Sequence, residues 1–329
     1  MLEAMTAPRT AFACFALALL LAGCRSGGPE LRWHTAVGRD HPLVGRIWDV
    51  GRGRFASEAA MAADMARARY VLLGEKHDNA DHHALQARLL AALVAEARKP
   101  AVAFEMLTPA QAPALARHLA AHPRDAAGIA QAVGWDASGW PDWTMYEPIA
   151  RVAVDAGLPV VAANLDDAQV RAVAREGVGA LDPSFVERHA LGVPLPGDHQ
   201  HSLAEEIRVS HCGHAPERRL AGMVTAQRAR DARLADAMLE APGDGAVLIA
   251  GAGHARRDRG VPAYLARHAP SARIVTIAFL EIENGYADPA RYRDRFGGVL
   301  PFDYVWFTPA VDGEDPCEKF RRSLERLRR

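Results

Sequence analysis

The chain has 329 residues, a formal net charge of −1 at neutral pH and a hydrophobic content of 50%. This length is sufficient for one large domain or two small ones. The charge is balanced, and no basic stripe is interleaved with aromatic residues, which argues against a nucleic-acid partner.

The N-terminal segment has the order of features found in a secretory signal. A single positive charge, Arg9, precedes an apolar run over residues 11–20, and Leu21-Ala22-Gly23-Cys24 follows it. The run is shorter than the roughly 20 residues that a membrane-spanning helix needs. A cysteine directly after Ala-Gly resembles the cleavage site of a bacterial lipoprotein, which implies acylation of Cys24. We therefore expect residues 1–23 to be a signal peptide.

The mature protein is expected to be anchored to a membrane through acyl chains on Cys24. Several chains hold a protein far better than one, because each buried methylene adds to the attachment. Arg25 stands where an aspartate would favour retention in the inner membrane. This favours the outer membrane, with the protein facing the periplasm or the cell surface. Residues 24–32 are expected to form a tether, and residues 33–329 a single domain.

Short apolar segments alternate with amphipathic helical patterns along this domain. Buried strands are predicted at residues 70–73, 101–104, 159–163, 246–250, 273–279 and 303–307. A helix is predicted to begin at Asn79 or Asp81, and others at residues 109–120, 125–133, 146–156, 166–176, 215–240, 262–268 and from 316 onward. The alternation predicts an α/β fold, with a mostly parallel sheet covered by helices on both faces.

Residues 192–216 interrupt the alternation. The segment is rich in proline, glycine and histidine, so we expect a helical or loop excursion before the long helix. Its histidines either bind a metal or are solvated, because their spacing fits no standard zinc pattern. Cys212 lies in the same segment. In an oxidising compartment it either pairs with Cys317 or stays free, since no spacing rule links the two.

Polar residues follow four of the predicted strands, at the edge where open α/β sheets bind ligands. Glu75 and His77 follow the first strand, Glu105 the second, Asn164 the third and His254 the fourth. A parallel sheet brings these strand ends to one edge, so we expect the five side chains to converge. A carboxylate directly after an apolar strand is partly desolvated and needs a cation, a metal or a hydrogen-bond donor.

Three further groups have two interpretations each. Of His82 and His83, one is expected to face the site and the other solvent. The aromatic group forms either core or a wall for a flat apolar ligand, with Tyr146 as a phenolate ligand or donor; it comprises Trp135, Trp140, Trp143 and Tyr146. The third group shares one face of the long helix and forms either a surface pair or a strut under the site; it comprises Gln227, Arg230 and Asp231.

Several of these segments resemble, in the same order, the motifs of the ChaN family of haem-binding, iron-regulated lipoproteins. The first is Gly74-Glu75-Lys76-His77-Asp78-Asn79 with His82, His83 and Gln86. The others are Phe104-Glu105-Met106 with Gln111; Trp143, Tyr146, Pro148 and Asn164; residues 227–231; and residues 251–262. The similarity spans about residues 40–280, and its specificity lies in the ordered set.

The resemblance implies a haem-binding protein in haem and iron acquisition, with an outer-membrane haem receptor as a partner. It also implies a homodimer that brings two haems face to face. Haem iron accepts histidine or tyrosine, so the axial candidates are Tyr146, His77 and His254. Further haem contacts are expected from three other residues, His83, Arg256 and Asn164.

An enzyme is the alternative, because the wider superfamily, which includes erythromycin-esterase-like proteins, contains metal-dependent proteases and esterases with a Gly-x-x-His motif. The segment from Gly74 to His77 has that form. Together with Glu75, Glu105 and His254, His77 could hold a divalent ion such as zinc and activate water for hydrolysis. No separate nucleophile motif is present, so we expect a haem carrier rather than an enzyme. In a third interpretation, an interaction module, the same residues are structural.

Overall fold

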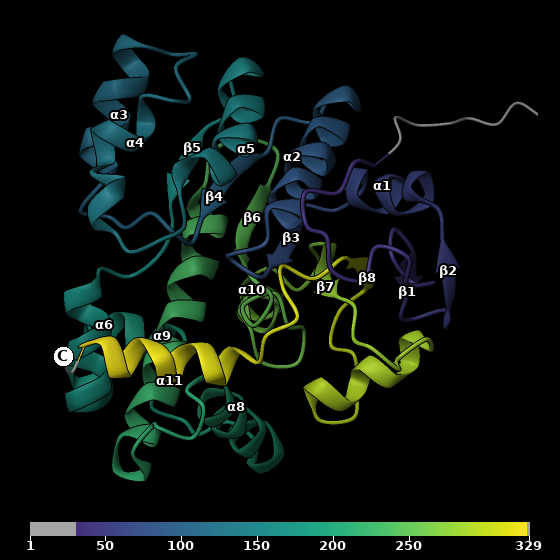
Figure 1. Cartoon of the computed structure of the whole chain (residues 1–329). Helices are drawn as coiled ribbons and strands as arrows, with labels where there is room; N and C mark the ends of the chain where they lie inside the picture. Colours follow the sequence, from purple (N-terminus) through teal and green to yellow (C-terminus); the bar gives the residue numbers. More distant parts are fainter. Residues whose placement is uncertain (1–30, 328–329) are drawn as a thin grey trace, which may run out of the picture. The chain divides into compact units, whose positions relative to one another are not determined.

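The computed structural model describes residues 31–327, and its central element is an eight-stranded sheet (Figure 1). The strands are β1 (Ile47–Asp49), β2 (Arg54–Ala56), β3 (Tyr70–Glu75), β4 (Ala101–Phe104), β5 (Val160–Ala162), β6 (Ala246–Gly251), β7 (Ile274–Glu281) and β8 (Tyr304–Thr308). Their order across the sheet is β2-β1-β8-β7-β3-β6-β4-β5. The six strands from β8 to β5 are parallel, while β1 and β2 add an antiparallel edge.

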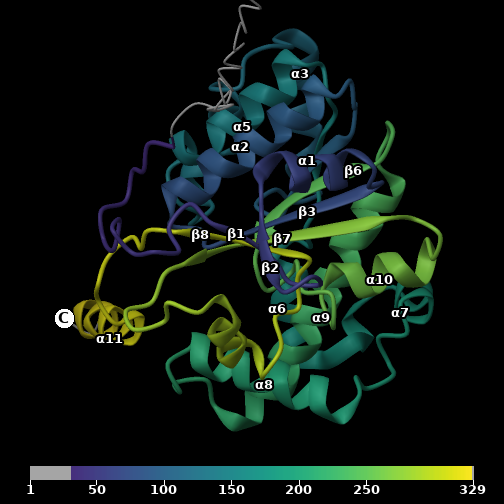
Figure 2. The same ribbon diagram turned by 90° about the vertical axis from the view of Figure 1, so that its right-hand side faces the viewer.

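Helices cover both faces of the sheet. The elements of the first half are α1 (Glu58–Ala66), α2 (Ala80–Ala95), α3 (Ala112–Ala121), α4 (Ile129–Val133), η1 (Trp135–Ala137), α5 (Trp143–Asp155), α6 (Asp167–Glu176) and η2 (Gly177–Ala180). Those of the second half are α7 (Pro183–Arg188), α8 (Gly197–Ser210), α9 (Glu217–Glu240), α10 (Val261–His268), η3 (Pro289–Phe296) and α11 (Pro316–Leu327). Figure 2 shows α1, α2 and α5 on one face and α6, α9 and α10 on the other.

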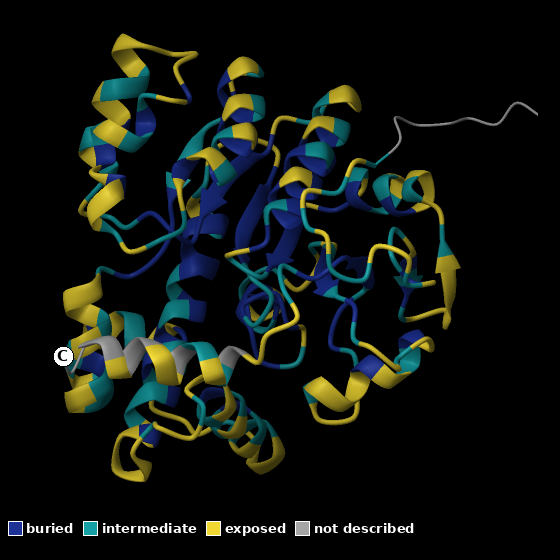
Figure 3. Cartoon of the chain, in the orientation of Figure 1, coloured by how far each residue is buried: buried dark blue, intermediate teal, exposed yellow. Residues whose placement is uncertain are grey.

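Burial explains why the predicted strands form. All six residues of β3 are buried, as are all four of β4, because helices cover them from both sides (Figure 3). Asn79 caps α2 by accepting hydrogen bonds from the amides of Asp81 and His82, and it thereby settles the choice of start residue. The predicted α/β class is confirmed, and residues 192–216 contain α8.

The strand order fixes where the predicted site residues lie. β6 enters the sheet between β3 and β4, although both of those strands precede it in the chain. In the register, Glu75 is opposite Gly251 and Phe104 is opposite Ile249. The carboxyl ends of these three strands are therefore neighbours at one edge of the sheet.

A disulfide joins Cys212, just after α8, to Cys317 in the first turn of α11. The structure thus resolves the choice that the sequence left open for these two cysteines. Residues Trp33–Arg329 form one compact unit. Among the described residues, no helix is both long and apolar enough to cross a bilayer. The predicted signal peptide, Cys24 and most of the tether lie outside the described residues.

Candidate functional site

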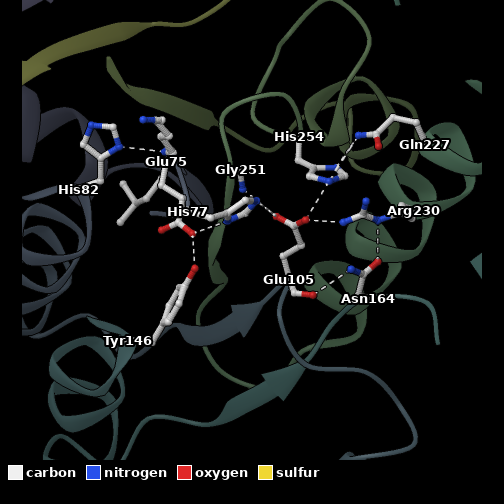
Figure 4. Close-up of polar contacts among 12 residues, drawn as sticks. Glu75, His77, His82, Glu105, Tyr146, Asn164, Gln227, Arg230, Gly251 and His254 are labelled. Atoms are coloured by element: carbon white, nitrogen blue, oxygen red, sulfur yellow. Dashed lines mark hydrogen bonds and ion pairs between the residues drawn. The ribbon is translucent and has the colours of Figure 1, made fainter. Parts of the chain in front are cut away.

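The site lies at the carboxyl ends of β3, β6 and β4 (Figure 4). Glu75 is the last residue of β3, Glu105 follows β4 directly, and His254 lies in the turn after β6. Gly251 is needed for this close approach, because a Cβ there would lie 2.9 Å from Nε2 of His77. The sheet therefore brings together residues that are up to 179 positions apart in sequence, from position 75 to position 254.

Glu75 is the centre of the first half of the site. Its Oε1 accepts hydrogen bonds from the Tyr146 hydroxyl at 3.0 Å and from Nδ1 of His77 at 2.8 Å. Its Oε2 lies 2.9 Å from Nδ1 of His83. Burial opposes the charged carboxylate, but His83 and His77 outweigh burial and lower the pKa of Glu75 to about 2. Glu75 is therefore a buried anion at neutral pH.

Glu105 is the centre of the second half. Its Oε2 accepts the Gly251 amide at 2.7 Å, and its Oε1 accepts from Arg230 and from Nε2 of His254 at 3.2 Å. Burial opposes its charge, yet His254 and then Arg230 hold the pKa of Glu105 well below its usual range. Asn164 fixes the backbone here, because its amide donates to the Glu105 carbonyl at 2.9 Å.

His254 is held between two carboxylates. Its Nδ1 donates to Asp231 at 2.6 Å, while its Nε2 faces Glu105. Burial would lower the pKa of His254, but Glu105 and Asp231 together raise it to about 9. Burial raises the pKa of Asp231. Since Gln227, Arg230 and Asp231 all contact the site, the strut interpretation of this helix face is correct.

His77 is the residue through which this cluster is exposed to solvent. Its side chain is 34% exposed, whereas Tyr146, His254, His83, Arg256 and Asn164 are all buried. Its ring meets Trp140 edge-on, with 4.8 Å between ring centroids, and its Nε2 lies 3.9 Å from Oε2 of Glu105. Burial opposes protonation of this ring, but the hydrogen bond to Glu75 and the charge of Glu105 raise the pKa of His77.

The structure corrects the expectation for His82 and His83, because neither faces solvent. His82 accepts the Lys76 amide and donates to Oγ1 of Thr308. Burial lowers the pKa of His82 well below its ordinary value. His83 instead packs against the Tyr146 ring, with 4.2 Å between centroids.

The aromatic residues were predicted to form either core or a wall for a flat ligand, and the structure places some of them in each role. Trp135 and Trp143 are buried core, while half-buried Trp140 lies beside His77. Tyr146 is fully buried and donates its hydroxyl hydrogen bond to Glu75. Burial and Glu75 raise the pKa of Tyr146 well above its usual value. In this conformation Tyr146 is a hydrogen-bond donor rather than a phenolate ligand.

Arg256 does not join the cluster. Its guanidinium pairs with Asp258 and Glu206 and donates to the Phe296 carbonyl. The metal alternative also receives no support from the geometry. Within residues 31–327, no group of three or more histidine, cysteine, aspartate or glutamate side chains is arranged to hold a metal ion. The acids at the site face imidazole, guanidinium, hydroxyl and amide donors instead, so the alternative of a divalent ion such as zinc is not supported.

The contacts that hold the loop after β3 in place could not be predicted from the sequence. Lys76 and Asn79 both donate to Glu281, at 3.1 and 2.8 Å, and the Val311 amide donates to the same carboxylate at 3.0 Å. Glu281 ends β7, more than 200 residues after Lys76. The position of the loop after β3 therefore depends on a strand pairing that no local pattern reveals.

The comparisons with known proteins agree with this arrangement. The model of a haem-binding uptake family, ChaN of the Tiki superfamily, matches residues 61–265. The chain belongs to this ChaN family. The resemblance predicted from the ordered motifs is thus confirmed, and it covers β3, β4 and β6. It also covers every residue of the Glu75–His254 cluster, by which we mean Glu75, His77, His83, Glu105, Tyr146, Asn164, Gln227, Arg230, Asp231 and His254.

Solved structures share the fold of this ChaN-family chain. ChaN of Campylobacter jejuni, a protein described by its cofacial haem binding, is 23% identical with a TM-score of 0.62, over 79% of this chain and 95% of that one. An erythromycin esterase, EreC in its open conformation, is 12% identical with a TM-score of 0.42, over 79% and 94%. The second likeness is too weak to bear on activity. No curated protein sequence matches the chain.

Proposed function

We propose that this protein binds haem at the exposed edge of the Glu75–His254 cluster and serves haem and iron acquisition. The observation that carries the proposal is the family match over residues 61–265, which contains every residue of the cluster. The family is one of haem-binding uptake proteins. The same membership supports a haem carrier rather than a hydrolase.

His77 is the side chain that best fits an axial ligand. Haem iron accepts an imidazole nitrogen, and metal-bound histidines usually donate their other ring nitrogen to a carboxylate. Nδ1 of His77 donates to Glu75, which leaves Nε2 as the ligating atom on a partly exposed ring. Trp140 beside this ring adds a flat apolar surface of the kind that a porphyrin plane packs against.

The cellular location of the protein and its partners are also part of the proposal. The sequence of the first 24 residues supports a lipid anchor on Cys24, and Arg25 supports the outer membrane, with the site facing the periplasm or cell surface. A haem receptor in that membrane is the expected partner. The cofacial haem of the Campylobacter jejuni protein supports a homodimer in which two haem-bound sites face each other.

A haem titration tests the proposal directly. The experiment uses a soluble form of the protein that begins at Ser26 and therefore lacks Cys24. This form keeps residues Trp33–Arg329, which form one compact unit. Haem is added to the wild type, to His77→Ala and to His122→Ala, an exposed histidine at the end of α3 that serves as the control. We expect a saturable Soret shift for the wild type and the control, and a weakened and spectrally altered one for His77→Ala.

Two results would contradict the proposal. A wild-type protein without a saturable Soret shift would remove haem binding altogether. If His77→Ala matched the wild type in both affinity and spectrum, haem binding would stand but the axial assignment would fail. Metal analysis of the same samples keeps the two chemistries apart, because a stoichiometric divalent ion without a haem response would favour hydrolysis.

A further inference from the structure

A second cavity lies on the α9 and α10 side of the sheet. It has a volume of about 290 Å³ and is lined by the segment between α7 and α8, by α9 and α10, and by the turn after β6. Glu75, His77, Glu105 and His254 are not among the residues that line it. At about 30 Å³ for each water molecule in the liquid, the cavity has room for about ten waters or for a small organic ligand of similar size.

Three arginines line this cavity, Arg228, Arg259 and Arg267, and their charges are balanced differently. Arg259 forms an ion pair with Glu206 and lies 3.5 Å from Asp258. Its charge is therefore neutralised within the protein, and it needs no ligand.

Arg228 and Arg267 have no such partner. Arg228 is 8% exposed, and its terminal nitrogens donate to three backbone carbonyls of residues 190–193, at 2.7 to 3.4 Å. Its Nε has no hydrogen-bond partner among the described residues. Arg267 donates to the His189 carbonyl at 3.1 Å. Over the part of the chain that the structure describes, neither guanidinium forms an ion pair with a carboxylate. Arg228 is thus a buried cation without a counter-charge, which is costly, whereas Arg267 is exposed at the rim of the cavity.

Part of the lining is apolar. It is formed by the segment between α7 and α8 together with Ala263 of α10; the segment contributes Val193, Pro194, Leu195 and Pro196. Val193 is 62% exposed. A ligand with one anionic end and an apolar body would neutralise the arginines and cover this apolar part at the same time.

Tyr264 adds a hydroxyl donor to the cavity. Burial and the nearby Asp231 raise the pKa of Tyr264 to about 12, although Arg228 acts in the opposite direction. The hydroxyl therefore stays protonated at neutral pH.

We propose that this cavity binds a small organic anion, with a carboxylate head between Arg228 and Arg267 and an apolar body along residues 193–196. The carboxylate of the ligand neutralises the two guanidiniums, and its alkyl tail excludes water from the exposed apolar segment. The size of the cavity corresponds to a medium-chain monocarboxylate. This binding site is independent of haem and of the proposed axial ligand.

Octanoate is a suitable probe, because it has ten non-hydrogen atoms. The experiment is calorimetric titration of the soluble form from Ser26 with sodium octanoate, with 1-octanol and with inorganic phosphate. Arg267→Gln removes one exposed cation of the cavity, and Arg171→Gln, an exposed position on α6, is the matched control. Thermal unfolding of each variant verifies that it is folded.

We expect saturable octanoate binding in the millimolar range or tighter, weakened about tenfold by Arg267→Gln and unchanged by Arg171→Gln, as for loss of a charge-assisted hydrogen bond. Octanol and phosphate are expected to bind at least tenfold more weakly than octanoate. The absence of saturable octanoate binding by the wild type would overturn the proposal. So would equal binding of octanol or phosphate, or an Arg267→Gln variant that binds octanoate as the wild type does.

Discussion

Tyr146 illustrates how the environment of a residue decides its role. The sequence offers it as a phenolate ligand, and haem proteins do use tyrosine in this way. In the fold its ring is fully buried against His83, and its hydroxyl donates to the buried anion Glu75. A phenolate there would face a carboxylate at 3.0 Å, so the neutral hydroxyl is strongly favoured.

Replacement of Tyr146 by phenylalanine tests this role. Tyr146→Phe removes one hydrogen bond to a buried charge, so we expect the free energy of unfolding to fall by about 1.5–3 kcal/mol. The haem spectrum is expected to stay that of the wild type, because the hydroxyl positions Glu75 and does not ligate. Urea unfolding and a haem titration of the same sample measure both effects. Loss of a tyrosinate-type spectrum in the variant would make Tyr146 the ligand after all.

The residues of the site were predictable to different degrees. Glu105 was found because a carboxylate directly after an apolar strand needs a partner, and His254 because it follows another strand at the same edge of the sheet; both have a partner. The exposure of His77 and the burial of His83 could not be predicted, since both lie in one polar segment. Which of the two opens to solvent depends on α5 and on Trp140, which are far away in sequence.

The secondary-structure elements, like the site residues, were predictable to different degrees. Continuous apolar runs predicted β3 to β8 closely, because strands buried on both faces need such runs. The edge strands β1 and β2 were missed, since each has only three residues and β2 is largely exposed. The position of β6 between β3 and β4 is a non-local pairing, and no local pattern in the sequence determines it.

The disulfide between α8 and α11 gives a prediction for these two elements. Among the side chains of α11 that the structure describes, ion pairs are formed within the helix or with residues 312–314. The Cys212–Cys317 bond links this helix covalently to the end of α8. We expect reduction to release α11. In the chain-entropy model, the loss of a bond that closes a loop of 105 residues lowers stability by at most about 4–5 kcal/mol.

Limited proteolysis with and without reductant measures this release, with melting curves of the same samples. The double variant Cys212→Ser, Cys317→Ser is the control, because reductant should not affect it further. The form beginning at Ser26 contains only these two cysteines, so a thiol titration is decisive. Two reactive thiols in the native, unreduced protein would contradict the bond.

At the scale of the whole molecule, the fold buries three carboxylates together with the cations that neutralise them. Glu75, Glu105 and Asp231 come from β3, the end of β4 and α9, and Glu75 contacts His83 of α2 and Tyr146 of α5 on the other face. The cluster therefore connects both faces of the sheet. Folding stability should therefore depend on the protonation of the histidines between them.

The pH dependence of stability has a defined sign. The pKa of His254 is about 9 in the folded protein, against an ordinary value of 6.5. A raised pKa gives a stabilisation that is complete below about pH 6.5 and is lost as the pH rises through about 9. The difference corresponds to about 3 kcal/mol. The pKa of Glu75 is lowered to about 2, so its stabilisation is present above about pH 4.5 and is lost on acidification. For these two groups the stabilisation is complete between about pH 4.5 and 6.5, while the lowered pKa of buried His82 acts in the opposite direction below about pH 6.5.

Urea unfolding of the haem-free protein between pH 6 and 10 measures how stability falls as the pH rises. His254→Gln is the informative variant, because it removes the titrating ring and keeps a polar side chain of similar size. It is expected to be less stable at pH 6, where it leaves Glu105 and Asp231 without this cation. Its stability should also fall less steeply with pH than that of the wild type. Equal slopes for the two proteins would show that His254 is neutral in the folded state. The ion-pair cluster would then contribute little to holding the two faces of the sheet together.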